Sequence, residues 1–285
     1  MYNYLSEENI DRFIAAALQE DIMDGDHSSL ASVPAQAQNT ANLLVKSEGI
    51  IAGVALAEKI FNKVDKDLSV ETFVKDGDKV SFGDIAFKVS GKAQSILSSE
   101  RLVLNCMQRM SGIATYTTEL NQLIAGTNAK LLDTRKTTPN FRIAEKWAVK
   151  IGGGQNHRFG LFDMVMLKDN HVDFAGGIEA AINSTVAYLK ENNLSLKIEI
   201  ETRSLEEVKE VMRVGKVDII MLDNMSPEIM SQALEIIDGE YVTEASGGIT
   251  EETIRKVAET GIDYISVGAL THSAPSLDMS LKAVS

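Results

Sequence analysis

Hydrophobic and polar positions follow two patterns along this 285-residue chain. Near the N-terminus, hydrophobic residues recur at helical spacing behind Ser6, whose hydroxyl group suits a helix N-cap. These hydrophobic residues are Ile10, Phe13, Ile14, Ala17 and Leu18. Short strand-like runs follow near 41–49, 68–75 and 84–91, with one helical segment between the first two, GVALAEKIFNKV. This first pattern predicts a small mixed α+β unit.

A long helical stretch from about Ser95 to Leu123 leads into the second pattern. From residue 130 onward, apolar runs alternate with amphipathic helical segments, which is typical of a parallel α/β architecture. Strands are predicted in the segments AKLLD, DMVMLK, LKIEIE, VDIIMLD, YVTEAS and DYISVG.

Charged residues or glycines follow these predicted strands at the point where each one ends. They are Asp133 to Lys136, Lys168, Glu201, Asp223, Glu244 and Gly268. In a β/α barrel, the carboxyl ends of the strands meet at one face, where active sites are built. One charged residue after a strand is commonly just the start of a solvated loop, but a series at successive strand ends indicates a site.

The loops after the last two predicted strands read EASGGIT and SVGALTHS. Their small residues leave backbone N–H groups accessible, and barrels often bind phosphate in the loops that follow their final strands. We therefore expect a phosphate group to bind at these loops.

The segment from 131 to 171 is the most basic part of the chain. Its cations surround the glycines at 152–154 and are Arg135, Lys136, Arg142, Lys146, Lys150, His157, Arg158, Lys168 and His171. Because the chain as a whole has a formal net charge of −13, this local cluster indicates a small polyanionic ligand. Nucleic acid is disfavoured as a partner, since proteins that bind it normally carry a basic overall balance.

Two kinds of bound group are not expected from the glycines and histidines. The three glycines lack the GxGxxG spacing of a dinucleotide site, so they are either a flexible turn or a turn that positions the donors of Gln155 to Arg158. The four histidines are too scattered along the chain to predict a transition-metal cluster. Glu201 and Asp223 are instead well placed to hold Mg²⁺ through water or to bind sugar hydroxyls.

The remaining features predict a cytoplasmic protein without a carrier function. The single cysteine, Cys106, lies in an apolar helical run and is expected to be buried and structural. No apolar run is long enough to span a membrane, and the first residues do not resemble a signal peptide. The segment VKDGDKVSFGDIAFKVSG is similar to half of a lipoyl or biotinyl module, but it lacks the lysine that such a module displays on its hairpin.

Long motifs in a fixed order give the chain a family resemblance. The motifs are DTRKTTP, EKWAVKIGGGQNHRFGL, MLKDNH, IEIET, IMLDN, ASGGI and SVGALTHS, preceded by EDIMDGDHSS and EGIIAGVALAEKIF. Together they resemble the quinolinate phosphoribosyltransferases, type II enzymes of NAD biosynthesis. The resemblance implies an N-terminal α/β sandwich in residues 1–110 and an incomplete, TIM-like α/β barrel in residues 111–271. It also implies that the C-terminal tail, 272–285, packs on the first domain.

The resemblance also implies roles for individual residues. Quinolinate would be bound by five cationic residues and by the neutral Thr134. The cationic residues are Arg135, Lys136, His157, Arg158 and Lys168. Arg101 would reach quinolinate in the site of a neighbouring subunit. Glu201 and Asp223 would act with Lys136 in catalysis, bind ribose and hold Mg²⁺. Phosphate would lie against Ser246, Gly247, Gly248, Val267, Gly268 and Ala269.

Two positions depart from the family pattern. The family usually has glycine where Asn140 stands, and asparagine tolerates a positive φ better than most residues. The family often has a further carboxylate where Thr202 and Arg203 follow Glu201, so Arg203 would add a cation near the ribose end. The implied partners are quinolinate, phosphoribosyl pyrophosphate and other copies of the chain, as a homodimer or a hexamer of dimers, with no organic cofactor.

Three alternatives remain open from the sequence. A related protein on the same scaffold, such as the one found in molybdate-transport loci or another pyridine phosphoribosyltransferase, would differ in substrate. A Schiff-base aldolase would use Lys168 at its strand end. A carrier or scaffold would not need charged residues at successive strand ends.

Overall fold

The computed structural model describes residues 3–284, which divide into two compact units. The antiparallel-sheet unit contains residues 3–118, 136–153 and 269–284, and the parallel-sheet unit contains residues 119–135 and 154–268. Each unit is described by itself below. Within residues 3–284, every helix is too short or too polar to span a lipid bilayer.

The antiparallel-sheet unit is built on four strands in the order β12-β1-β5-β3. They are β1 (Gln38–Val45), β3 (Ser69–Thr72), β5 (Ile85–Lys92) and β12 (Met279–Ala283). Every second residue of β1 is buried from Ala41 to Val45, as the alternation of side chains in a strand requires. The C-terminal strand β12 pairs with β1, so distant parts of the chain form one sheet. A second, two-stranded sheet pairs β2 (Gly49–Ile50) with β4 (Lys79–Val80).

The helices of this unit include two whose first turn is capped by a side chain, that of Ser6 or that of Asp26. The unit's helices are α1 (Glu7–Ile22), α2 (His27–Ser32), α3 (Val54–Val64), α5 (Arg142–Ile151), α11 (Ala269–His272) and most of α4 (Ala93–Leu123). The predicted cap is confirmed, because the Ser6 hydroxyl accepts a hydrogen bond from the Asn9 N–H at 3.3 Å. Phe61 of α3 packs edge-on against Phe87 of β5, with ring centroids 5.6 Å apart, which joins helix and sheet in one core.

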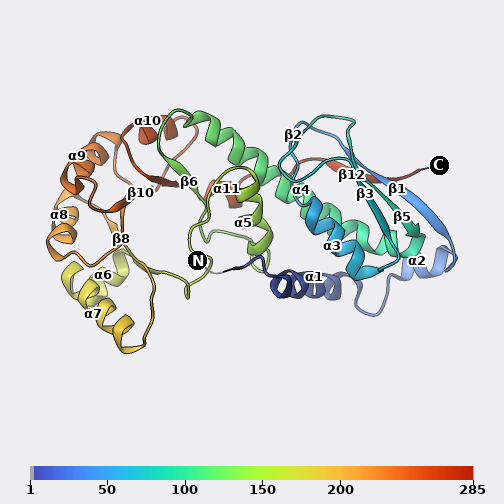
Figure 1. Ribbon diagram of the computed structural model, residues 1–285, viewed down its shortest axis with the longest axis horizontal. Helices are drawn as coiled ribbons and strands as arrows, with labels where there is room; N and C mark the ends of the chain where they lie inside the picture. The colour runs from blue at the N-terminus through green and yellow to red at the C-terminus, as the bar shows by residue number, and fades with distance from the viewer. Residues whose placement is uncertain (1–2, 285) are drawn as a thin grey trace. The chain divides into compact units, whose positions relative to one another are not determined.

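The parallel-sheet unit contains six strands in the order β6-β11-β10-β9-β8-β7, all parallel (Figure 1). They are β6 (Lys130–Leu132), β7 (Val165–Leu167), β8 (Ile198–Thr202), β9 (Ile219–Asp223), β10 (Val242–Ser246) and β11 (Tyr264–Ser266). Each falls in a segment predicted to be a strand. No pairing closes the sheet between β6 and β7 within residues 3–284, so the barrel is incomplete and the predicted fold class is confirmed.

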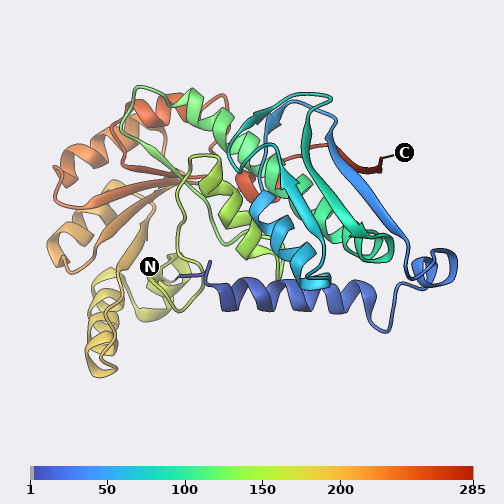
Figure 2. The same cartoon turned by 45° about the vertical axis from the view of Figure 1, so that its right-hand side comes forward.

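Helices cover the outer face of this sheet. They are α6 (Asp169–Ala175), α7 (Ile178–Glu191), α8 (Leu205–Val214), α9 (Pro227–Ile237) and α10 (Ile254–Glu259). In Figure 1 and Figure 2, α8, α9 and α10 lie outside the curve of the strands. Ile220 and Leu222 of β9 are fully buried, as the helix-facing side of such a sheet requires.

The opposite, inner face of the sheet is polar. Paired residues of neighbouring parallel strands point to the same side, and Glu201 of β8 pairs with Met221, which in turn pairs with Glu244 of β10. Glu199 lies two residues before Glu201 and therefore points to that same side. The inner face thus carries several carboxylates, although every residue of β8 is buried. This polarity singles out the inner face as the place for a site.

Candidate active site

The segment after the triple glycine lies along the edge strand β6. Gln155 donates its N–H to Leu131 O at 2.8 Å and accepts from the Asp133 N–H at 3.1 Å. The buried Asp133 carboxylate then accepts hydrogen bonds from the His157 N–H at 2.9 Å and from Asn156 Nδ2 at 2.5 Å. These bonds fix the backbone of the QNHR segment beside the carboxyl end of β6, where Thr134 and Arg135 follow.

The packing of Gly152 indicates that the three glycines form an ordered turn. It ends α5, and a Cβ atom there would lie 2.5 Å from the Ala114 carbonyl oxygen of α4. Backbone atoms cannot give way as a flexible side chain can, so this position requires glycine for close packing.

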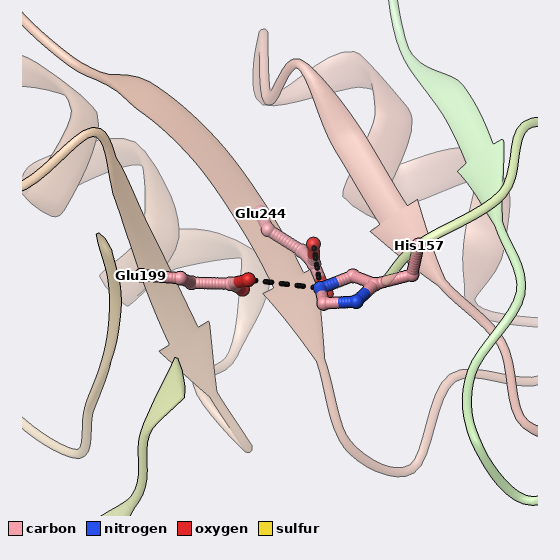
Figure 3. Close-up of side chains that lie close together, drawn as sticks. All are labelled: His157, Glu199 and Glu244. Atoms are coloured by element: carbon pink, nitrogen blue, oxygen red, sulfur yellow. Dashed lines mark hydrogen bonds and ion pairs between the residues drawn. The ribbon is translucent and has the colours of Figure 1, made fainter. Parts of the chain in front are cut away.

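Three side chains meet on the inner face of the parallel sheet: His157, Glu199 and Glu244 (Figure 3). His157 Nε2 lies 2.8 Å from Glu199 Oε2 and 3.4 Å from Glu244 Oε2. At the other side of the ring, Nδ1 accepts a hydrogen bond from the Arg158 N–H at 2.7 Å. All three residues are buried, and Glu199 and Glu244 are at most 1% exposed. We call them the inner trio.

The inner trio is incompletely hydrogen-bonded. Glu199 Oε1 and Glu244 Oε1 are buried without a hydrogen-bond partner among residues 3–284. One nitrogen or oxygen atom from each of the three residues lies within 4.8 Å of the other two, so by spacing alone the trio could hold a metal ion. It is the one such group within the described residues. It consists of one histidine and two carboxylates.

The carboxylates of the inner trio change the pKa of His157. Burial alone would lower that pKa, but hydrogen bonds and negative charge from Glu199 and Glu244 outweigh burial and raise it to about 9. The Arg158 N–H opposes this shift, since it needs an unprotonated Nδ1. A neutral hydrogen bond contributes about 1 kcal/mol, and hydrogen bonds to charged groups contribute about 1.5–3 kcal/mol each, so the two carboxylates dominate. Burial and the charge of Glu244 raise the pKa of Glu199.

Sequence reasoning missed the inner trio as a unit. Glu244 was identified only as a strand end, and Glu199 was not identified. The alternation in Ile198–Thr202, IEIET, is the signal that could have found Glu199, because it places both glutamates on one face of the strand. That His157 contacts quinolinate stays a prediction.

Arg158 is a buried cation that feels the positive charge of Arg135. Arg158 is 8% exposed and donates from Nη1 to Met164 O at 3.2 Å. Burial and then the positive charge of Arg135 lower the pKa of Arg158. An anionic ligand beside Arg158 would offset both effects, because its negative charge favours the charged guanidinium.

Lys168 and Glu201 also meet, as their places at adjacent strand ends suggest. Lys168 Nζ donates to Glu201 Oε2 at 3.1 Å from the end of β7, which pairs with β8. The lysine side chain is half exposed, whereas Glu201 is buried. Arg203, which stands where the family often has a carboxylate, is held at the surface by ion pairs with Glu207 and Asp173. The distances from its Nη2 to their oxygens are 2.8 and 3.2 Å.

Asp223 lies at the end of β9, beside the predicted phosphate loops. Asn224 Nδ2 donates to Asp223 Oδ2 at 2.7 Å, and the Asn224 N–H donates to Ser246 O at 2.9 Å. Gly247 has φ 90°, and a Cβ atom there would lie 2.3 Å from Asn224 Oδ1. Gly248 also has a positive φ, 61°, and this backbone conformation favours glycine at both positions of the turn. Val267 and Gly268 follow the neighbouring strand β11.

The other predicted site residues lie in the antiparallel-sheet unit. Arg101 is exposed on α4, Lys136 is exposed in the loop before α5, and Ala269 begins α11. Asn140 has φ 62°, a backbone conformation that asparagine tolerates better than most residues. Cys106 is buried, as expected, and burial raises the pKa of its thiol to about 12.

Comparison with known proteins places the whole chain in one family. Residues 26–111 match the N-terminal domain of quinolinate phosphoribosyl transferase, and residues 113–282 match the C-terminal domain. The chain is 49% identical to quinolinate phosphoribosyltransferase [decarboxylating] 2, mitochondrial, of Nicotiana glauca, over 93% of this chain and 80% of that protein. It is 41% identical to the probable nicotinate-nucleotide pyrophosphorylase [carboxylating] of Bacillus subtilis, over 92% of this chain and 89% of that protein.

Solved structures agree. The crystal structure of NadC from Streptococcus pyogenes is similar with a TM-score of 0.90 and 40% identity, covering 99% of both chains. The nicotinate-nucleotide pyrophosphorylase from Francisella tularensis has a TM-score of 0.89 and 38% identity, covering 99% of this chain and 98% of that one. Sequence and fold therefore agree that the chain belongs to the quinolinate phosphoribosyltransferase family.

Proposed function

We propose that this protein is a decarboxylating quinolinate phosphoribosyltransferase of NAD biosynthesis. It converts quinolinate and phosphoribosyl pyrophosphate into nicotinate mononucleotide, pyrophosphate and CO₂. The observation that carries the proposal is the set of side chains at the carboxyl ends of one parallel sheet. There, Arg158 feels the positive charge of Arg135, while the Lys168–Glu201 pair and Asp223 follow adjacent strands.

The arginines account for recognition of quinolinate. Quinolinate carries two neighbouring carboxylates on a planar ring, and the fork of an arginine matches a carboxylate with two parallel hydrogen bonds. Burial and the positive charge of Arg135 lower the pKa of Arg158, and a dianion bound beside it offsets both effects. Lys136 and His157 are proposed as further cations around quinolinate, and Thr134 as a neutral neighbour.

Glu201 and Asp223 account for transfer of the ribosyl group. As the bond from C1′ to pyrophosphate breaks, positive charge develops on the ribose, and carboxylates placed nearby stabilise that charge. The electron pair of the pyridine nitrogen then forms the new bond to C1′. We propose Lys136 as a third catalytic residue, and the loops of Ser246 to Gly248 and Val267 to Ala269 as the phosphate site.

Decarboxylation follows from the chemistry of the product ring. Once the nitrogen carries the ribose, it is positively charged and withdraws electrons from the adjacent carbon. The bond from that carbon to its carboxylate breaks, CO₂ leaves, and the electron pair stays on the ring carbon. A proton from water completes nicotinate mononucleotide.

The carboxylates also fit Mg²⁺, which prefers oxygen ligands and keeps several water molecules. Lys168 bonds to one oxygen of Glu201 and Asn224 to one oxygen of Asp223, and each carboxylate has a second oxygen for a hydrated cation. When bound, Mg²⁺ would neutralise the leaving pyrophosphate.

We propose a shared site in a homodimer, or in a hexamer of dimers, because Arg101 is exposed on α4. Arg101→Ala and Lys136→Ala proteins would each be nearly inactive. Mixing them with verified subunit exchange would restore up to about a quarter of the sites in a random dimer. No recovery after exchange contradicts the shared site.

A cytoplasmic location is also proposed, and cell fractionation would test it, since relatives include mitochondrial and chloroplastic proteins.

The test of function is release of CO₂ from carboxyl-labelled quinolinate with phosphoribosyl pyrophosphate and Mg²⁺. Release must require both substrates, and nicotinate in place of quinolinate must give no nucleotide. Arg158→Ala would weaken quinolinate binding by about 2–5 kcal/mol, because it leaves a desolvated carboxylate unpaired. Absence of CO₂ release, or labelling of Lys168 by borohydride with a carbonyl substrate, contradicts the proposal and favours another reaction.

A further inference from the structure

The segment that carries Lys136 is held by a buried carboxylate of the next helix. Glu145 of α5 is fully buried in the antiparallel-sheet unit. Its Oε2 accepts the Thr138 N–H at 2.9 Å, and its Oε1 accepts the Thr138 hydroxyl at 3.1 Å. Two hydrogen bonds from one residue therefore anchor the loop two positions after Lys136.

Arg109 of α4 joins this carboxylate to the start of the C-terminal segment. Its Nε donates to Glu145 Oε1 at 3.2 Å, and its Nη1 donates to Ala274 O at 2.6 Å. Its Nη2 donates to Thr271 O in α11. All three nitrogens of the guanidinium are therefore used, and they hold two distant stretches of chain together.

Thr271 closes the network. This buried residue donates its hydroxyl to Lys136 O at 2.8 Å. A continuous circuit thus runs from Lys136 through Thr138, Glu145, Arg109 and Thr271 back to Lys136. We call it the Arg109 network. Thr271 belongs to α11, the helix that Ala269 begins, so the circuit joins a proposed catalytic lysine to a proposed phosphate-binding segment.

The position of the network distinguishes it from ordinary core bonding. It holds loop and helix-end atoms of 136–138 and 271–274, and two of the residues in the loop, Lys136 and Thr138, are exposed. An ion pair with a buried carboxylate is a costly way to join elements that apolar packing could join, but it fixes atoms with the directionality of hydrogen bonds. Precise placement of exposed backbone is what a binding segment needs.

We propose that Arg109 and Glu145 are positioning residues that lock the Lys136 loop and the start of α11 into one rigid unit. This proposal rests on the proposed function, because Lys136 and Ala269 have their roles from it. Arg109 and Glu145 act through the backbone they hold, and no contact between them and a substrate is needed.

The first experiment tests the lock without activity. Hydrogen exchange is followed at the Thr138 amide in wild-type and Glu145→Gln proteins, with Glu8→Gln as the control at an exposed glutamate of the same unit. The lock predicts a protected Thr138 amide in the wild type and faster exchange, by about tenfold or more, in Glu145→Gln, as expected for loss of a charge-assisted hydrogen bond. Unchanged exchange in Glu145→Gln overturns the lock, whether or not the protein has the proposed activity.

The second experiment tests whether the Arg109 network positions Lys136 for catalysis. Thr271→Val removes only the hydroxyl that holds Lys136 O, and Thr271→Ser keeps it. We expect Thr271→Val to lower kcat by about tenfold, the rate equivalent of one lost hydrogen bond, and Thr271→Ser to retain most of the activity. In a Lys136→Ala background, Thr271→Val should have no further effect, because positioning acts through the lysine.

The outcomes separate cleanly. Equal losses in both backgrounds, or equal losses in Val and Ser variants, would show a merely structural role and overturn the positioning proposal. Thermal unfolding of each variant shows whether an activity loss reflects unfolding. An inactive wild type would instead contradict the proposed function, and the exchange experiment would still decide whether the network locks the loop.

Discussion

The molecule contains two charge networks built on buried carboxylates, and they differ in how completely they are hydrogen-bonded. In the Arg109 network, both oxygens of Glu145 have hydrogen-bond partners, and all three nitrogens of Arg109 are used. In the inner trio, two carboxylates face one imidazole, and Glu199 Oε1 and Glu244 Oε1 have no hydrogen-bond partner among residues 3–284. One network is electrically and geometrically complete, and the other is not.

The difference shows what each network can do. A complete network has little to gain from a proton or a ligand, so it fixes the chain in place. An incomplete network stores electrostatic energy, because two buried carboxylates share one cation, and it responds to protons and to charges nearby. We therefore expect rigidity from Arg109 and Glu145, and pH sensitivity from His157.

The largest effect should come from breaking the complete network. Glu145→Ala leaves Arg109 Nε and the Thr138 N–H without their acceptor, and we expect the unfolding free energy to fall by about 3–5 kcal/mol, as for other broken ion pairs with a buried partner. Urea unfolding measures this change. The exposed Glu8–Arg12 pair is the control, since Glu8→Ala should cost less than about 1 kcal/mol. A loss in Glu145→Ala as small as that of the control would show that the network contributes no stability.

The next effect is a pH dependence from the inner trio. Because the folded-state pKa of His157 is about 9, above its usual 6.5, its stabilising contribution is complete below pH 6.5 and is lost as pH rises through 9. We expect a loss of about 3 kcal/mol in unfolding free energy between pH 6.5 and 10 from this group. Unfolding curves of wild-type and His157→Asn proteins across that range isolate it, because the variant should have a flatter profile. Parallel profiles would mean that the ring does not hold the proton.

The smallest effect should come from Glu244→Gln. It removes one of two like charges and keeps the shape of the side chain, so the change in unfolding free energy should stay within about 1 kcal/mol. The pKa of His157 should fall toward its usual value, since one of the carboxylates that raises it is gone. NMR titration of the imidazole would measure this shift. A destabilisation as large as that of Glu145→Ala would show that Glu244 belongs to a complete network too.

Much of the parallel sheet could be predicted from the sequence, because its strands are short apolar runs that end in charged residues. Lys168, Glu201 and Asp223 were found in this way, since strand ends are local signals. The pairing of His157 with Glu199 and Glu244 was not predicted, because it depends on strand register and on the course of the segment after Gly154. Arg109 and Glu145 lie on different helices, and no local pattern relates them.

The pairing of β12 with β1 has a consequence for how the protein is made. A ribosome makes β1 before every strand of the parallel sheet and β12 after all of them. Until residues 279–283 emerge, one edge of β1 exposes backbone groups that can pair with another chain. The parallel sheet can fold before β12 is made, whereas the antiparallel sheet is completed only once β12 is available. Newly made chains therefore pass through a stage in which this edge of β1 is open to pairing with another chain.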